Sequence, residues 1–258
     1  MQDKQLNFFM SSKNILVTAP SEMCGNLKLL IDQNPDFFTH TPLEQYEPFI
    51  QREESDALKA LLHTFTFVVY GSLGNAKYFI RWVKEHEQMD VIQNLVHFVM
   101  DKPAAQFLEK NGVPAIMPRE NARPIDIMEF MLRVSKEGKT LYPKSKEKAE
   151  EMPGLLHELQ MPVAEFTVSR EKELQSGTLK SHRLKFSDED PKVILFHNRS
   201  SVTRSVTAFP NLNLSEKVII SGSAGVTQML VDKAIEPGFE AEGSWPSIGE
   251  LIQKEILS

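Results

Sequence analysis

The apolar residues of this chain recur with two periods that alternate along its length. Short apolar runs, such as Phe65–Tyr70 and Val193–Phe196, are each followed by a segment whose apolar residues fall on one face of a helix. Buried strands that alternate with helices are typical of domains in which helical crossovers join parallel strands. The sequence therefore predicts an α/β fold with mainly parallel sheets.

Two of the expected helices carry specific predictions. In the first, Ile125, Met128 and Leu132 are spaced to form the buried stripe. In the second, Ser247 and Glu250 have the spacing of a capping box, which predicts a helix start at Ser247.

Two extended-looking segments interrupt the alternation and suggest how the chain is divided. They flank a central block of strand–helix units whose order is repeated, in blurred form, near the C-terminus. We expect two similar lobes joined by a two-stranded β connector, with one lobe inserted into the other. Residues 1–38 and 170–258 would form lobe one, 49–160 lobe two, and 39–48 and 161–169 the connector. A single long sheet with a hairpin at its edge is the alternative.

Composition narrows the class of partner and the compartment. The 258 residues include 29 Lys and Arg against 35 Asp and Glu, a formal charge of −6, which disfavours a general grip on nucleic acid or an anionic membrane. The single Cys24 excludes an intrachain disulfide and a zinc site of several thiolates. No signal-like or membrane-spanning apolar run is present. We expect a soluble, cytoplasmic protein.

Three turns between strands and helices are candidate anion sites. They read YGSLGN at Tyr70–Asn75, HNRSS at His197–Ser201 and GSAG at Gly222–Gly225. Free backbone N–H groups at a helix start favour an anion, and ligands of open α/β sheets bind outside the carboxyl ends of strands. The turns together outline a cradle for small anions or carboxylates. The alternative is that Gly and Ser occur in such turns for steric reasons alone.

A lysine cluster follows the expected strand at 140–143. Lys144, Lys146 and Lys148 would lie in the turn after it, either as a solvated face or as the counter-charge for a polyanionic ligand.

Familiar catalytic signatures are missing from the chain. It has no Walker loop, no GxGxxG, no HExxH and no Gly-x-Ser-x-Gly elbow, and its seven His residues lack ligand spacing. The sequence therefore indicates neither a metal nor a nucleotide cofactor.

Taken in order, these pieces resemble the uroporphyrinogen-III synthase family over nearly the whole chain. The N-terminal ILVTAP strand, the three turns and the closing PGFEAEGSWPSIGELIQ carry the resemblance. The tail matches the family's ending at Pro237, Ala241, Glu242, Ser247 and Leu251.

The resemblance implies an activity as well as a fold. Members of the family are lyases of tetrapyrrole and haem biosynthesis. They cyclise the linear tetrapyrrole hydroxymethylbilane to uroporphyrinogen III, with loss of water and inversion of the last pyrrole ring, ring D. No cofactor or metal takes part, and the family precedent is a monomer whose partner is the small-molecule substrate alone.

The resemblance and the turns together give the candidate site. We expect substrate contacts from Thr18, Ser72, Gly74, Lys144, Asn198, Ser200, Gly222, Ser223 and Gly225. Ser169 stands where the family tends to place a Tyr, and it is the candidate for a catalytic role.

Departures from the family pattern keep two other functions open. The usual Thr-Arg-Pro reads Thr18-Ala19-Pro20, and the Thr expected at the GSAG turn is replaced by Gly225. A non-catalytic relative that binds a tetrapyrrole or another polycarboxylate, as a sensor or partner module, would fit these losses. A two-lobed binding protein for an unrelated small solute is the third hypothesis.

Overall fold

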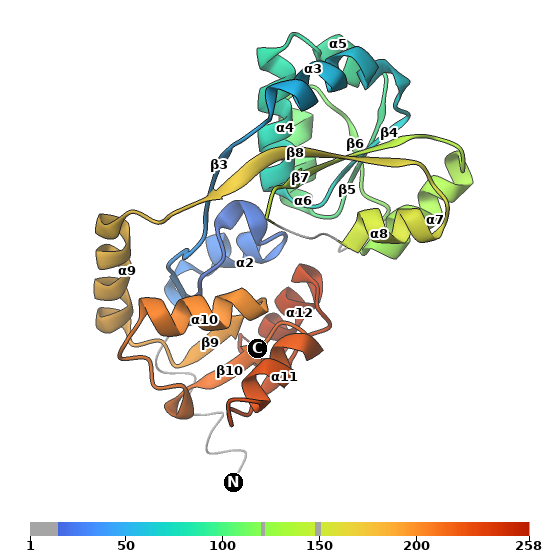
Figure 1. Cartoon of the computed structure of the whole chain (residues 1–258). Helices are drawn as coiled ribbons and strands as arrows, with labels where there is room; N and C mark the ends of the chain where they lie inside the picture. Colours follow the sequence, from blue (N-terminus) through green and yellow to red (C-terminus); the bar gives the residue numbers. More distant parts are fainter. Residues whose placement is uncertain (1–14, 120–121, 148–150, 258) are drawn as a thin grey trace. The chain divides into compact units, whose positions relative to one another are not determined.

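A computed structural model describes residues 15–119, 122–147 and 151–257 of the chain (Figure 1). The chain divides into two compact units. Unit 1 comprises residues 1–45 and 173–258, and unit 2 comprises residues 46–172. Each unit is built on its own sheet, and the expected α/β fold with two parallel-sheet lobes is confirmed.

Unit 1 contains a five-stranded sheet in which every neighbouring pair is parallel. Its strands, in spatial order, are β11 (Phe239–Glu240), β10 (Val218–Ser221), β9 (Val193–Phe196), β1 (Ile15–Val17) and β2 (Phe38–His40).

Helices cover both faces of this sheet, because its strands are apolar on both sides. Val17 packs on one face and Leu16 on the other, and both are fully buried. The first face carries α2 (Leu27–Gln33) and α12 (Trp245–Glu255). The second carries α9 (Ser176–Glu189), α10 (Arg199–Ala208) and α11 (Ala224–Val231). Three short 3-10 turns, at Ser21–Met23, Pro35–Phe37 and Leu214–Glu216, complete the described part of unit 1.

Unit 2 contains a six-stranded sheet. Its strands, in spatial order, are β3 (Gln45–Pro48), β8 (Val163–Lys172), β7 (Thr140–Ser145), β4 (Phe67–Tyr70), β5 (Val96–Val99) and β6 (Ala115–Ile116). The strands from β8 to β6 are mutually parallel.

Alternation along β4 again produces two buried faces. Val68 packs with the helices on one face, and Phe67 packs with those on the other. The first face is covered by α3 (Arg52–Leu61), α4 (Leu73–Glu85), α5 (Met89–Ile92), α6 (Lys102–Lys110) and the 3-10 turn Leu62–Thr64. The second is covered by α7 (Pro124–Val134) and α8 (Glu151–Glu158).

The segments expected to connect the lobes are parts of these sheets. Phe38–His40 pairs with β1 in unit 1, whereas β3 and β8 lie side by side in the sheet of unit 2. The chain passes from unit 1 to unit 2 after Gln45 and returns after Lys172.

Each sheet has one position at which the chain reverses its direction of strand addition. In unit 1 this position lies between β1 and β9, and in unit 2 it lies between β4 and β7. The helices that follow such neighbouring strands lie on opposite faces, which opens a crevice outside the strands' carboxyl ends. The turns after these four strands are therefore the candidate ligand sites.

The apolar stripe predicted for α7 is right at Met128 and wrong at Ile125 and Leu132. Ile125 and Leu132 are 44% and 39% exposed, while Ile127, Met128 and Met131 face the core. The helix carries apolar residues on more than one side, so spacing alone could not identify the buried face.

The predicted start of the last helix is also wrong. Helix α12 begins at Trp245, and its N-cap is Ser244, whose side chain accepts a hydrogen bond from the backbone N–H of Ser247. Ser247 is therefore the third helical residue. The capping box pairs Ser244 with Ser247 instead of Ser247 with Glu250.

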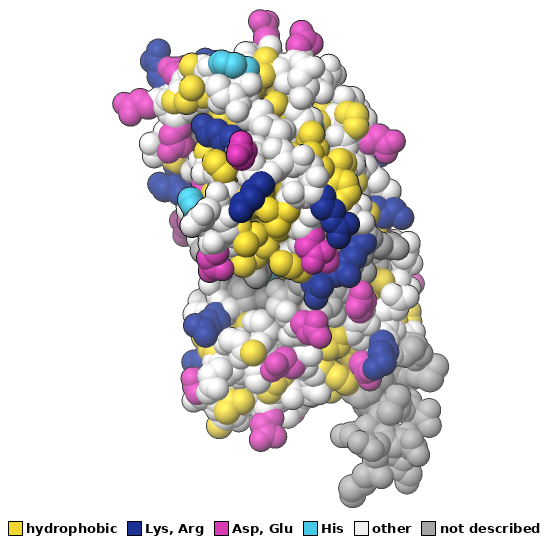
Figure 2. All heavy atoms as spheres, turned by 90° about the vertical axis from the view of Figure 1, so that its right-hand side faces the viewer, with side chains coloured by type: hydrophobic (Ala, Val, Ile, Leu, Met, Phe, Trp, Pro, Cys, Tyr) yellow, Lys and Arg dark blue, Asp and Glu magenta, His cyan; other side chains and the backbone are white. Residues whose placement is uncertain are grey.

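No helix in the described residues is long and apolar enough to cross a membrane. Charged side chains of both signs are scattered over the face of the molecule shown in Figure 2.

A glycine pair tests how tightly the strand-end turns of unit 1 pack. A Cβ atom added at Gly222 would lie 2.8 Å from the backbone oxygen of His197, whereas one added at Gly249 in α12 would meet nothing within 4 Å. We expect Gly222→Ala to lower the free energy of unfolding by about 1–3 kcal/mol through overpacking. Gly249→Ala should raise it by roughly 0.5–1 kcal/mol, because it relieves a helical glycine. Urea unfolding of the two variants measures both effects, and equal stabilities would contradict the packing described.

Candidate functional site

The turn after β9 caps helix α10. The Asn198 side chain accepts a hydrogen bond from the backbone N–H of Ser201 at 2.7 Å, and the backbone N–H of Asn198 donates to Ser201 Oγ at 3.2 Å. Ser200 lies in the first helical turn and is exposed. These contacts position the start of α10 at the carboxyl end of its strand.

The turn after β10 lies directly against the turn after β9. The backbone N–H of Gly222 donates to the carbonyl of Phe196 at 2.8 Å, and only a residue without a Cβ fits this close approach. Arg199 Nε donates to the carbonyl of Gly225 at 3.0 Å, which ties the first turns of α10 and α11 together. Ser223 is the N-cap of α11, and its side chain makes no capping hydrogen bond. The structure thus brings Asn198, Ser200 and the Gly222–Gly225 turn into one neighbourhood.

Backbone donors remain open at these helix starts. Within the described residues, the amides of Arg199 and Ser200 in α10 and of Ala224 and Gly225 in α11 have no hydrogen-bond partner. Such amides carry the positive end of the helix dipole. With the Arg199 guanidinium beside them, they form a surface suited to carboxylates.

Thr18 lies at the same edge of the sheet but is 1% exposed. Its carbonyl accepts a hydrogen bond from the backbone N–H of Leu43 at 2.8 Å. In this structure Thr18 supports the loop after β2, and its contact with a ligand stays a prediction.

A buried polar cluster that the sequence did not reveal stands behind these turns. Glu44 is 7% exposed, and its carboxylate lies 2.6 Å from Arg204 Nη1 and 3.4 Å from His197 Nε2. The His197 ring also stacks on Trp245 at 5.2 Å. These contacts join the loop before β3 to α10, and removal of one partner would leave a buried charge uncompensated.

In unit 2, the turn after β4 repeats the arrangement seen after β9. Ser72 is the N-cap of α4, and its side chain accepts a hydrogen bond from the backbone N–H of Asn75 at 3.2 Å. In the described residues, the amides of Leu73 and Gly74 have no partner. Ser72, Leu73 and Gly74 are all buried, so the unpaired amides of this turn do not reach solvent in this structure.

Lys144 and Ser169 lie on the neighbouring strands. Lys144 is in β7 and not in the expected turn, because the strand continues to Ser145; its ammonium lies 2.5 Å from the carboxylate of Glu165 on β8. Ser169 is fully buried opposite Ser145, and its hydroxyl has no hydrogen-bond partner in the described residues. Lys148 lies outside the described residues.

Asp101 is a further strand-end residue that sequence reasoning missed. It follows β5, is 4% exposed, and accepts a hydrogen bond from the backbone N–H of Ala104 at 2.8 Å as the N-cap of α6. Burial raises the pKa of Asp101 to about 6. The Asp-Lys-Pro order, with proline in the first helical turn, is the signal that could have identified this cap.

The chain is therefore an α/β protein of two parallel-sheet units, each with open backbone amides at the carboxyl ends of its central strands. Solved uroporphyrinogen-III synthases have the same fold. One is a uroporphyrinogen-III synthetase from Helicobacter pylori, with a TM-score of 0.57 and 14% identity over 94% of this chain and 98% of that chain. Another is a mutant uroporphyrinogen III synthase from the extremely thermophilic bacterium Thermus thermophilus, with a TM-score of 0.50 and 11% identity over 94% of this chain and 96% of that chain.

Comparisons of the sequence found no match, either with a protein-family model or with a curated protein.

The buried carboxyl of Asp101 makes stability depend on pH. Because its pKa in the folded protein lies near 6 and above its ordinary value of 3.8, the folded state binds the proton more tightly. The stabilisation is complete below about pH 4 and is lost as the pH rises through about 6. Asn keeps the cap without the charge, so Asp101→Asn should be more stable than the parent at about pH 7 by on the order of 3 kcal/mol.

Thermal unfolding of both proteins between about pH 4 and pH 7 measures this difference. The unfolding temperatures of the parent and of Asp101→Asn should converge at about pH 4. A variant that is less stable than the parent throughout the range would contradict the assignment.

Proposed function

We propose that the protein is a uroporphyrinogen-III synthase: a lyase that cyclises hydroxymethylbilane to uroporphyrinogen III, with loss of water and inversion of ring D. The observation that carries this proposal is the set of open amide pairs after β9 and β10, in a fold shared with solved uroporphyrinogen-III synthases. The substrate bears a carboxylate on each acetate and propionate side chain. Helix starts with open N–H groups are a physically suitable lining for such groups.

The reaction requires control of the geometry of ring closure more than it requires a strong acid or base. Hydroxymethylbilane also closes without an enzyme, but to the isomer in which ring D is not inverted. The protein must therefore favour one closing geometry over the other, and each tenfold of preference needs about 1.4 kcal/mol of differential transition-state binding. Fixed backbone donors supply such a preference without a reactive side chain.

In this proposal, the starts of α10 and α11 hold one group of carboxylates. Arg199 adds a side-chain cation to the amides of Ser200 and Gly225, and Asn198 and Gly222 fix their positions. In unit 2, the amides of Leu73 and Gly74 are unpaired within the described residues but buried, so they add no contact to the proposal in this structure. The electrostatic attraction of a helix start is typically 0.3–1 kcal/mol per carboxylate, so several are needed to hold the substrate.

One observation favours a second function, binding without turnover. Ser169, the candidate for the catalytic role, is fully buried and presents no hydroxyl to solvent. The open amides do not depend on side-chain identity, so a tetrapyrrole or another polycarboxylate could still bind, and the protein would then act as a sensor or partner module.

Incubation of the purified protein with hydroxymethylbilane, followed by oxidation and separation of the porphyrin isomers, tests the proposal. We expect the type III isomer to predominate and to form faster than in a protein-free control. Type I isomer alone, at the rate of the control, would refute turnover. Tight binding of uroporphyrin under the same conditions would then favour the second function.

A further inference from the structure

A second group of cations gathers around one aromatic ring in unit 2. The ammonium of Lys146 lies 5.0 Å from the ring centroid of Phe49, and the guanidinium carbon of Arg170 lies 4.8 Å from it. Phe49 follows β3, Arg170 belongs to β8, and Lys146 follows β7. Three segments that are distant in sequence therefore place two positive charges against a single ring, and we name this surface the Phe49 face.

The charge of the Phe49 face follows from alternation along β8. Side chains two residues apart point to the same side of a strand, so Lys172 joins Arg170 while Glu171 points away. The acid on this side is Glu47, which accepts a hydrogen bond from Arg170 at 2.8 Å and lies 3.6 Å from Lys172. The hydrogen bond from Arg170 lowers the pKa of Glu47, so this carboxylate is charged near neutral pH.

Glu47 forms ion pairs with Arg170 and Lys172 but not with Lys146. Lys146 is exposed, and no carboxylate in the described part of the chain forms an ion pair with it. Contact with an aromatic face orients an ammonium without neutralising it, and its remaining N–H groups stay available to an acceptor. The Phe49 face therefore carries three cations near the carboxylates of Glu47 and Glu147; Glu147 accepts a hydrogen bond from the backbone N–H of Glu171 at 2.8 Å and forms no ion pair with Lys146 in the described residues.

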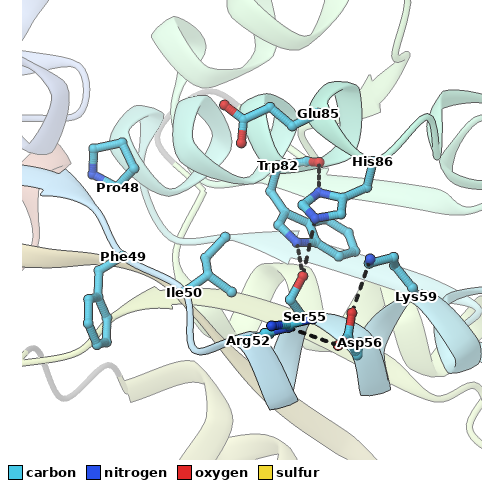
Figure 3. A pocket seen from close by; sticks show the side chains of 10 residues that line it. All are labelled: Pro48, Phe49, Ile50, Arg52, Ser55, Asp56, Lys59, Trp82, Glu85 and His86. Carbon is cyan, nitrogen blue, oxygen red and sulfur yellow. Dashed lines mark hydrogen bonds and ion pairs between the residues drawn. The ribbon is translucent and has the colours of Figure 1, made fainter.

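A hollow adjoins the Phe49 face. It has a volume of about 440 Å³, and Figure 3 shows Pro48, Phe49 and Ile50 along one side of it. Arg52 lies at its rim with a side chain that is 95% exposed and only weakly paired, 4.0 Å from Asp56. The hollow thus combines an apolar wall with a fourth cation, while the carboxylate of Asp56 is paired with Lys59 at 3.1 Å.

The polar groups of the floor are already satisfied. Trp82 Nε1 donates to Ser55 Oγ at 2.8 Å, and His86 Nδ1 bonds the carbonyl of Trp82 at 2.8 Å. Glu85 is paired with Arg81 at 2.7 Å. A ligand would therefore gain its polar contacts at the rim, from Arg52 and the Phe49 face, and its apolar contacts from the wall.

We propose that the Phe49 face and this hollow form a subsite for the carboxylated side chains of the tetrapyrrole, with Lys146 as its main cation. This inference rests on the proposed function, and it adds a substrate subsite built from side chains to the backbone amides at the strand ends. The ligand class is an apolar ring system that carries several carboxylates.

The test uses uroporphyrin I, a fluorescent and unreactive macrocycle with the same kinds of carboxylate side chain. Lys146→Met keeps the length and the apolar stem of the side chain and removes the charge. Lys139→Met is a matched control, since the Lys139 ammonium lies 4.4 Å from the ring centroid of Phe65 in the same unit. Both dissociation constants are measured by fluorescence titration at low salt.

We expect Lys146→Met to weaken binding by about threefold to tenfold and to reduce its salt dependence, because one exposed, charge-assisted contact is lost. Lys139→Met should bind like the parent. Equal affinities of the two variants, or no binding by the parent protein, would overturn the subsite.

The outcome can be separated from that of the proposed function. Formation of type III isomer by the parent, together with equal affinities of the two variants, overturns the subsite and leaves turnover standing. A loss of binding confined to Lys146→Met, without any type III isomer, supports the subsite and refutes turnover.

Discussion

Backbone N–H groups at the first turn of a helix have no carbonyl to bind within the helix, and the arrangement of this protein depends on that constraint. Each strand–helix unit brings such a turn to the carboxyl edge of its sheet. Side-chain caps satisfy part of the need: Ser72 and Asn198 each accept one amide. The two amides before each accepted one have no hydrogen-bond partner in the described residues, and they lie at the positions where strand order reverses. Those of Arg199 and Ser200 are exposed, whereas those of Leu73 and Gly74 are buried.

Fixed donors are useful only if the turns that carry them are rigid, and the packing around them supplies this rigidity. Gly222 allows the turn after β10 to contact the turn after β9, and Arg199 joins the helices that follow. Behind them, the buried carboxylate of Glu44 lies against Arg204 and His197. A change to this network should therefore alter binding at a distance from any ligand contact.

Local periodicity made much of this fold predictable. The apolar runs at Phe67–Tyr70 and Val193–Phe196 are strands, and the Gly- and Ser-rich turns after them precede helices, because these features depend on neighbouring residues alone. The buried face of α7 was not predictable, since Ile125 and Ile127 are equally apolar and only the packed sheet distinguishes them.

Contacts between distant segments were beyond sequence reasoning. Glu44 and Arg204 meet because the loop before β3 packs against α10, and Phe49 meets Lys146 and Arg170 because β3, β8 and β7 are neighbours in space. The lysine cluster was visible in the sequence, but the contacts of its members were not. Lys144 forms an ion pair with Glu165, while Lys146 lies over the ring of Phe49.

The chain shares its fold with a solved uroporphyrinogen-III synthetase at 14% identity. In the proposed function, backbone amides and not side chains would hold the ligand, so the divergent strand-end side chains are compatible with binding. Every substitution except proline keeps the backbone N–H, so a proline substitution tests the role of a single amide most directly. Ala224 is exposed at the first position of α11, where proline fits a helix and the extended Ser223 can precede it. Calorimetric titration of Ala224→Pro and Ala224→Ser with uroporphyrin I should show about tenfold weaker binding for the proline variant alone, since it loses one hydrogen bond to a carboxylate. Equal binding by both variants would show that the open amides do not hold the ligand.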